Sequence, residues 1–375
     1  MNTTKRILFL LMIIGLYSCE NKTTTDKFVF DSSTPVCTDK TMLSSIIDIK
    51  NIIPLETNDY SIIGDIGKIL KYKDKIYILY NRKTVLVFND KGRFIQQIGS
   101  LGAGPGEYQL IGDFDVTDEN IYIRYYQKIQ RYNLDGSYVS SITFDVNLFG
   151  INVVKDKILG FVTNDNKVSH IFTTDGKLIN KYHPESKAAT IGTSNYYWPL
   201  EEDLYLFPFV NSNDALAYNT KNNEYNYMKL IDLPDMLTLD DINHLNENGT
   251  VYNIREKGRV VWPFNSNTEQ AFCITPKGIE KGILWIKDKD SKVEKAFDCE
   301  HIINDISFTN IQSFFSCFTR SEDSFIAYIM PYELKEALQQ EKERNLQSDF
   351  HSRMKDLANS LSEEDNPILI EYEFK

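Results

Sequence analysis

The sequence predicts an all-β fold assembled from one repeated, four-stranded unit, and three observations carry this prediction. The 375 residues include 22 Tyr and 22 Phe, which favour strands over helices. A strand–turn–strand pattern with glycine at its turn recurs along the chain. An apolar strand precedes the copies of this pattern. Strand and pattern together form one repeat, and its length is typical of folds built from repeated β-sheets.

The composition excludes several classes of protein. Hydrophobic residues make up 42% and charged residues 25% of the chain, which are ordinary values for a globular protein. The net charge of −12 argues against a nucleic-acid partner, because phosphate binding needs clustered Lys and Arg. Five cysteines are too few for a disulfide scaffold.

The N-terminus predicts an export signal over residues 1–18. Lys5 and Arg6 precede an apolar run that is too short for a stable membrane span but suits the core of a signal peptide. Residues 16–19, Leu-Tyr-Ser-Cys, resemble a bacterial lipobox, which implies that Cys19 is lipidated and becomes the mature N-terminus. The alternative is a plain secretory signal with a chance cysteine. Two or more acyl chains on Cys19 would anchor the protein stably to a membrane.

Residues 19–45 predict a flexible tether between this lipid and a single folded domain over residues 46–375. Thr, Ser, Asp and Lys dominate the segment, and no hydrophobic periodicity is present. No later run of apolar residues is long enough to span a membrane.

The recurring turns predict β-hairpins. Gly92, Gly136 and Gly176 each follow a strand and a turn that contains aspartate, and a weaker copy contains Gly278. A degenerate copy over residues 215–225 replaces the glycine with asparagine. These residues tolerate the positive φ that a tight turn between twisted strands requires.

Six copies of the preceding strand predict six units. They cover residues 75–80, 120–125, 157–162, 203–208, 258–263 and 323–329. The sixth unit lacks a downstream hairpin, and residues 367–374 and 46–55 can supply its missing strands, the latter as the strand that closes the ring. The sequence therefore predicts a six-bladed β-propeller. The alternative, an irregular pair of β-sandwiches, would need no fixed repeat.

A helical insertion is predicted over about residues 333–361, before the last strand. Its apolar stripe consists of Leu346, Phe350, Met354, Leu357 and Leu361, at spacings of three and four. Pro367 and the polar residues before it end the helix. The stripe either packs on the propeller or binds a partner. Packing is favoured, because a stripe of this width usually faces the protein's own core.

The sequence does not match the motifs of known catalytic and metal sites. The glycine-rich run 102–108 lacks the lysine and helix of a phosphate loop and is expected to connect two blades. The five histidines are scattered, and the acidic run from Asp288 loses the calcium-loop pattern at Val293 and Cys299. No Gly-x-Ser-x-Gly elbow occurs. We therefore predict no catalytic residue, metal ligand or cofactor, and an axial calcium has no sequence support.

Four cysteines of the mature chain have an open redox state. Cys37 lies in the predicted tether, and Cys273, Cys299 and Cys317 follow one another in the last two blades. An extracytoplasmic location permits disulfides, and a Cys299–Cys317 bond is conceivable. Buried free thiols that pack as small apolar residues are an equal alternative.

Two aromatic clusters are candidates for a ligand-binding rim. They contain Tyr196, Tyr197 and Trp198 in one strand end and Trp262 in another, and each places Trp before Pro. Flat aromatic faces stack well on sugars and on partner proteins. The alternative is that these rings fill the space between blades.

Residues 98–139 resemble one NHL-type propeller repeat, through Ile98–Tyr108, Asp115–Tyr122 and Ile129–Gly136. Together with the lipobox and the Asn366-Pro367 strand, this repeat resembles the six-bladed β-propeller lipoproteins of Bacteroidota-type bacteria. The resemblance covers most of residues 46–375 and is strongest in one blade. It implies a lipid-anchored propeller of the cell envelope, on the periplasmic or the surface side of the outer membrane.

The predicted function is that of an extracytoplasmic binding or scaffold propeller with a protein or glycan partner. The failed catalytic motifs favour this role over that of an enzyme. One alternative is a metal-dependent hydrolase or lactonase, by analogy with other six-bladed propellers. It would require three or four Asp, Glu, Asn or His side chains at one end of the axis. Another is a structural subunit of an envelope complex, which would expose a contiguous apolar patch.

Overall fold

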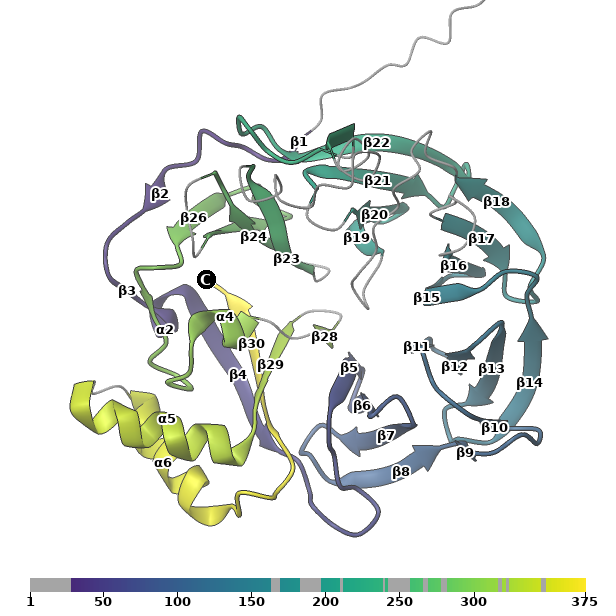
Figure 1. The fold of residues 1–375 in the computed structure, drawn as a ribbon, viewed down its shortest axis with the longest axis horizontal. Coiled ribbons are helices and arrows are strands. Elements are labelled where there is room, and N and C mark those ends of the chain that lie inside the picture. The colour runs from purple at the N-terminus through teal and green to yellow at the C-terminus, as the bar shows by residue number, and fades with distance from the viewer. Residues whose placement is uncertain are drawn as a thin grey trace, which may run out of the picture.

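Six blades form a closed ring around a central axis in the computed structural model (Figure 1). The structure describes residues 28–162, 169–182, 197–209, 212–238, 240–241, 257–265, 269–277, 282–315, 319–321, 324–344 and 349–375. The predicted all-β, six-bladed propeller is confirmed, as is a small helical element before the last strand. Among the described helices, none is long and apolar enough to cross a membrane.

Blades 1 to 3 each contain four consecutive antiparallel strands, and the first of the four lies toward the axis (Figure 1). Blade 1 consists of β5 (Ile66–Tyr72), β6 (Lys75–Tyr80), β7 (Thr84–Asn89) and β8 (Phe94–Ile98). Blade 2 consists of β11 (Asp113–Val116), β12 (Asn120–Tyr125), β13 (Lys128–Asn133) and β14 (Tyr138–Thr143). Blade 3 consists of β15 (Leu148–Val154), β16 (Lys157–Val162), β17 (Ser169–Thr173) and β18 (Leu178–Tyr182).

The glycine turns of these three blades have the predicted geometry. Gly92, Gly136 and Gly176 have φ of 79°, 86° and 92°, and each lies between the third and fourth strands of its blade. L-residues with a side chain rarely adopt this conformation, which explains why the repeat keeps glycine there. The glycine-rich run 102–108 lies between blades 1 and 2, as expected, with β9 (Ser100–Leu101) pairing to β10 (Glu107–Tyr108).

Blades 4 and 5 repeat the same order. Blade 4 contains β19 (Trp198–Glu201), β20 (Leu204–Pro208), β21 (Asp214–Asn219) and β22 (Glu224–Ile231). Blade 5 contains β23 (Arg259–Asn265), β24 (Glu269–Thr275), β25 (Ile283–Asp288) and β26 (Glu294–Asp298). The apolar strand expected over residues 258–263 is the innermost strand here, whereas its counterparts in blades 1 to 4 are second strands.

Blade 6 closes the ring with strands from both ends of the chain. Its order is β29 (Phe325–Ile329), β30 (Ile368–Phe374) and β4 (Ile47–Pro54), so the N-terminal strand is outermost. The predicted closing strand over residues 46–55 is therefore confirmed. Before β29, α4 (Ile311–Phe315) leads to β28 (Thr319–Arg320), which pairs with the inner strand of blade 1.

Residues 28–46 form an N-terminal strap around the outside of blades 4 to 6 (Figure 1). β1 (Phe28–Phe30) pairs in parallel with β22, and β2 (Val36–Cys37) with β26. β3 (Thr41–Met42) then pairs with β27 (Ile302–Ile303), and α2 (Leu43–Ile46) leads into β4. The predicted tether over residues 19–45 is thus wrong from Phe28 onwards, because the outer strands offer free backbone groups that this segment satisfies.

The helical insertion is a pair of helices rather than one helix over residues 333–361. α5 (Pro331–Arg344) and α6 (Asp349–Ser360) pack on each other beside blade 6 (Figure 1). Met354 is fully buried, and Phe350, Leu357 and Leu361 pack against the same core cluster as the blade 6 strands. Leu346 lies outside the described residues. The stripe therefore faces the protein's own core in the part of the chain that the structure describes.

Asn366 joins the last strand to the segment that enters blade 1. Its amide donates to the backbone oxygens of Glu56 and Ser61, at 2.6 Å each, and its carbonyl accepts from the N–H of Ile63 at 2.8 Å. The side chain is buried, so water cannot replace these bonds.

We expect Asn366→Ala to lower the free energy of unfolding by about 3 kcal/mol, because it leaves several buried backbone groups without a partner. Urea denaturation measures this loss. The matched control is Asn222→Ala in an exposed turn, where the loss should stay below about 0.5 kcal/mol. Equal losses in the two variants would contradict a structural role for the Asn366 amide.

Candidate functional site

An open pocket of about 560 Å³ lies across the propeller axis. Its lining comes from the inner parts of blades 1 to 4 and from Ser321, which precedes blade 6. The turns that join the first and second strands of blades 2 and 3, over residues 116–120 and 153–156, form most of its wall. We call this site the axial pocket.

Aromatic and uncharged polar side chains make up ten of the 19 residues that line the axial pocket. The aromatic ones are Tyr72, Tyr122, Tyr197, Trp198 and Tyr205. The uncharged polar ones are Thr117, Asn120, Asn152, Thr174 and Ser321. Rings that supply flat apolar faces beside fixed hydrogen-bonding groups are typical of small-molecule sites.

Most charges at the edge of the axial pocket are paired within the protein. Asp118 forms an ion pair with Lys73, and hydrogen bonds from Lys73 and Tyr72 lower the pKa of the Asp118 carboxyl. Lys155 contacts Asp203 at 2.5 Å, and Asp156 contacts Lys157 at 3.1 Å.

A hydrogen bond from Lys157 lowers the pKa of Asp156 in the same way. Lowered values keep the Asp118 and Asp156 carboxylates ionised and balanced by lysine at neutral pH. Glu119 and Arg131 also line the pocket and add one charge of each sign, so the pocket edge carries little net charge.

Arg131 and Asn152 are two further polar residues that line the pocket. Burial raises the pKa of Tyr122, while the neighbouring guanidinium of Arg131 opposes that shift. The Nε of Arg131 is buried and donates to no acceptor among the described residues. Asn152 is buried, lines the pocket and accepts from the N–H of Tyr197 at 3.3 Å.

Lys289 supports the pocket wall from blade 5. Its Nζ donates to the backbone oxygen of Pro199, a lining residue, at 2.6 Å. Burial, with a contribution from the nearby Lys292, lowers the pKa of Lys289 to about 8. The contact holds the start of β19 against the neighbouring blade.

The predicted rim aromatics meet this pocket only in part. Tyr197 and Trp198 border it, but their exposed fractions are 1% and 4%. The Tyr197 hydroxyl bonds to Ser169 of blade 3, and burial raises its pKa. Trp198 packs edge-on against Phe272 of blade 5, with ring centroids 6.0 Å apart. Both rings therefore also fill the space between blades, as the alternative interpretation held.

The structure does not describe the side chains of the other predicted site residues. Tyr196 and the lipidation candidate Cys19 lie outside the described residues, as does the whole signal segment. The backbone of Trp262 belongs to β23, and its side chain is not among those described. A role for these residues stays a prediction.

Sequence reasoning missed Tyr72, Tyr205, Asn152 and Arg131 as pocket residues. Tyr72 and Asn152 lie at or near the end of a first strand, and Tyr205 lies near the start of a second strand. These three residues lie beside the turn between the first and second strands of blades 1, 3 and 4, whereas Arg131 lies on the third strand of blade 2. That place becomes readable only when the register of each blade is known.

A metal site finds no support among the described residues, where no three His, Cys, Asp or Glu side chains lie close enough to hold an ion. The acidic run from Asp288 is the turn between β25 and β26. There the Asp288 carboxylate accepts from the N–H of Ser291 at 2.5 Å, which is a turn contact.

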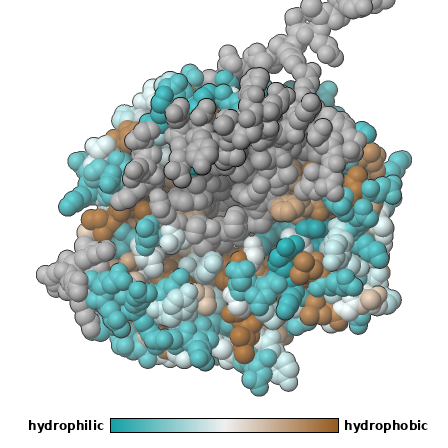
Figure 2. Space-filling model, viewed as in Figure 1, coloured by the Kyte–Doolittle hydropathy of each residue, from teal (hydrophilic) through white to brown (hydrophobic). Residues whose placement is uncertain are grey.

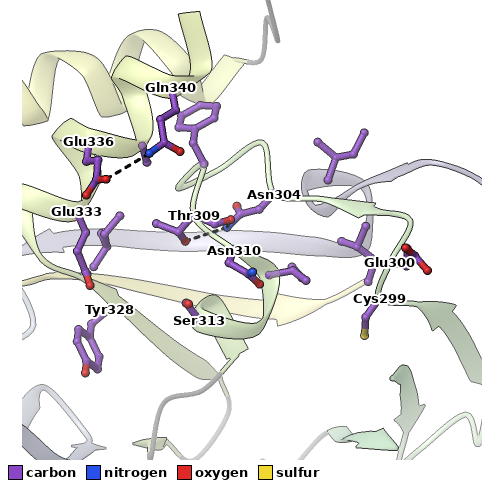
Figure 3. Close-up of a pocket in the computed structure, with 16 residues that line it drawn as sticks. Cys299, Glu300, Asn304, Thr309, Asn310, Ser313, Tyr328, Glu333, Glu336 and Gln340 are labelled. Atoms are coloured by element: carbon purple, nitrogen blue, oxygen red, sulfur yellow. Dashed lines mark hydrogen bonds between the residues drawn. The ribbon is translucent and has the colours of Figure 1, made fainter. Parts of the chain in front are cut away.

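A second pocket, of about 770 Å³, lies off the axis between α5 and the segment that leads into α4 (Figure 3). Glu300, Glu333 and Glu336 border it, and we call it the helix groove. Several of its polar groups are already used by the fold. Asn304 bonds to Ser307 at 2.8 Å and to Thr309, and Glu333 accepts from the N–H of Met330 at 3.1 Å.

The described surface is mostly hydrophilic on the face shown in Figure 2, and its hydrophobic residues occur in small, separated groups. The exposed apolar side chains are spread over several blades, for example Tyr60 in the segment before blade 1 and Leu178 in blade 3. Such scattered exposure is ordinary for a soluble surface.

Comparison with solved structures supports the fold. A Bacteroides fragilis protein described as exported superimposes with a TM-score of 0.72 at 18% identity, over 93% of this chain and 100% of that one. A member of the DUF4221 family from Bacteroides vulgatus superimposes with a TM-score of 0.54 at 8% identity, over 88% and 98% of the two chains. At these identities the likeness concerns the fold alone.

Comparison at the level of sequence assigns a family without a biochemical role. No curated protein matches the chain. The resemblance to NHL-type repeats and to propeller lipoproteins stays a prediction. One family model matches residues 28–373, so the match begins where the strap begins and includes all six blades. The chain therefore belongs to the family described as Domain of unknown function (DUF4934).

Proposed function

We propose that this protein is an extracytoplasmic binding propeller, anchored to the outer membrane through a lipid on Cys19, which binds a neutral glycan in its axial pocket. The composition of the axial pocket is the observation that carries the proposal. The lipobox-like residues and the fold shared with an exported Bacteroides protein support the location.

A sugar fits the chemistry of the pocket wall. Sugar rings have an apolar C–H face and a rim of hydroxyl groups. Tyr72 and Tyr205 are partly exposed and provide flat rings on which the C–H face of a sugar can stack. Asn152 and Arg131 provide hydrogen-bond donors for its hydroxyl groups. The alternative partner, a protein segment, would use the same rings with more aliphatic contact.

The charge pattern favours an uncharged ligand. Asp118, Lys155 and Asp156 already have partners of opposite charge, so a charged ligand would have to displace them. The same pattern argues against a hydrolytic role for Asp118 and Asp156. Asp118 and Asp156 have lowered pKa values and are ionised at neutral pH, so neither can donate a proton as a general acid.

We expect the full-length lipid-free chain to bind at least one neutral hexasaccharide from a panel of cello-, malto-, manno-, xylo- and galacto-oligomers in calorimetry. Tyr205→Ala should weaken that binding at least about tenfold, because a stacked ring supplies on the order of 1.4 kcal/mol. Thermal melting checks that the variant is folded.

Tyr60→Ala is the matched control, since Tyr60 is exposed and lies in the segment before blade 1, away from the axis. It should leave binding unchanged. Binding that survives Tyr205→Ala would exclude the axial pocket, and an absence of binding to every oligomer would refute the glycan proposal. Capture of a peptide at the same pocket would identify a protein partner instead.

A further inference from the structure

Two buried thiols face each other in blade 5. Cys273 lies on β24, and Cys299 follows the end of β26. Their Sγ atoms are 3.9 Å apart, and their exposed fractions are 2% and 3%. A disulfide bond is about 2.05 Å long, and β25 lies between the two strands, so closing this gap requires both side chains and the backbones on either side of β25 to move together.

Gly282 shapes the space between the two cysteines. Its carbonyl accepts a hydrogen bond from the N–H of Cys299 at 3.0 Å, which fixes the backbone at that residue. Its φ is 84°, and a Cβ at this position would lie 2.9 Å from the Sγ of Cys273. A glycine here thus both positions Cys299 and leaves room for the sulfur of Cys273.

The surroundings of the pair are those of a disulfide rather than of a metal site. Neighbouring members of the same core cluster, such as Ala271, Leu284 and Ile302, are apolar. Among the described residues, no third His, Cys, Asp or Glu joins the two thiols. Cys37 is partly exposed and contacts the hydroxyl of Thr41 at 3.7 Å instead.

We propose that Cys273 and Cys299 form a disulfide within blade 5 when the chain folds under oxidising conditions. The proposal takes the oxidising compartment from the proposed extracytoplasmic function and is otherwise independent of it. The oxidant is a disulfide compound or protein, RSSR. One cysteine thiolate attacks it, releases one RSH and forms a mixed disulfide, and the second cysteine then displaces the other RSH. The two cysteines lose two electrons and two protons, and RSSR gains them.

The exchange must take place before blade 5 has closed. In the folded chain the neighbouring Cys299 sulfur and burial raise the pKa of Cys273, so little of its thiolate is present to react. Burial also keeps reductants out once the bond has formed. The bond would tie β24 to the segment that forms one end of the helix groove, where Cys299 lies (Figure 3).

Oxidative refolding tests the pairing. The reduced, denatured full chain is refolded in a buffer of reduced and oxidised glutathione, and free thiols are then alkylated with N-ethylmaleimide in denaturant. Mass spectrometry of the digest should find the Cys273 and Cys299 peptides linked, 2 Da below the sum of their reduced masses. Alkylation of both cysteines, or a link from Cys299 to Cys317, would overturn the proposal.

Stability supplies a second readout. The chain refolded with glutathione should melt about 5 °C above the chain refolded in dithiothreitol, because the bond restricts the unfolded chain. Cys37→Ser should leave this difference unchanged, and equal melting temperatures would count against the bond. A link in the refolded chain that is missing from protein purified from an envelope fraction would contradict the proposed location and leave the pairing supported.

Discussion

Replacing Asp113 by alanine should lower the free energy of unfolding by about 3 to 5 kcal/mol, because it leaves a buried ammonium group without its carboxylate. Lys68 of blade 1 and Asp113 of blade 2 have side-chain exposed fractions of 0% and 2%, and their Nζ and Oδ1 atoms are 2.8 Å apart. Lys68 also donates to the backbone oxygen of Phe114 at 2.7 Å. Urea denaturation measures the loss.

The same carboxylate reaches a third blade. Its Oδ2 accepts from the N–H of Ile151 in β15 at 2.8 Å. Asp115, two residues further along β11, repeats this contact with the N–H of Val153 at 2.6 Å. Because the first strands of blades 1 to 3 meet at these side chains, the loss should appear as a change in global stability rather than as fraying of one blade.

Asp118→Ala is the matched control, because its ion pair with Lys73 lies at the surface and should contribute less than about 1 kcal/mol. The double variant Lys68→Met, Asp113→Leu should recover most of the stability, since buried ion pairs can often be replaced by apolar residues of similar size. A loss in Asp113→Ala no larger than in the control would refute the importance of the buried pair.

The turns and the closing strand were readable because their determinants are local. Gly92, Gly136 and Gly176 repeat at the same place in three blades, and each has the positive φ that a side chain would strain. Residues 46–55 are rich in isoleucine, which favours strands, and ring closure needs an outer strand for blade 6. Local pattern and topology therefore agree there.

The strap and the paired helices were missed for two different reasons. The strap pairs with β22, β26 and β27 through strands of only two or three residues, which are too short to show a period-two side-chain pattern. The sequence between Tyr332 and Ser360 contains neither proline nor glycine, and the weaker signals of a break, Asn345 after Arg344 and Ser348 before Asp349, were overlooked.

The axial pocket was out of reach for a geometric reason. Tyr72, Asn152 and Tyr205 belong to three different blades, and only closure of the ring brings them together. The aromatic pair Tyr197 and Trp198 was found, because adjacent large rings before a proline are visible in the sequence. Whether such rings face a ligand or a neighbouring blade depends on packing that the sequence does not contain.

Phe30→Ala should destabilise the propeller by about 3 to 4 kcal/mol, although the residue lies near the end of the described chain. Its ring has an exposed fraction of 1% and meets Phe272 of blade 5 edge-on, with centroids 5.0 Å apart. Lys287 donates to the backbone oxygen of Val29 at 2.6 Å and also forms an ion pair with Glu294 at 2.8 Å. Urea denaturation measures the loss of stability, and hydrogen exchange of the β1 and β22 amides locates it.

Ile95→Ala is the matched control for the strap, because Ile95 lies on β8, an outer strand of blade 1, and is partly exposed. Its loss should stay below about 1 kcal/mol. If Phe30→Ala cost no more, the strap would be an attached segment rather than part of the domain. A larger loss of stability in Phe30→Ala would mean that the strap can carry a pulling force under the proposed function. A lipid anchor on Cys19 would then pull on β1 first, and the parallel pairing of β1 with β22 would load blades 4 and 5 together before any single blade could open.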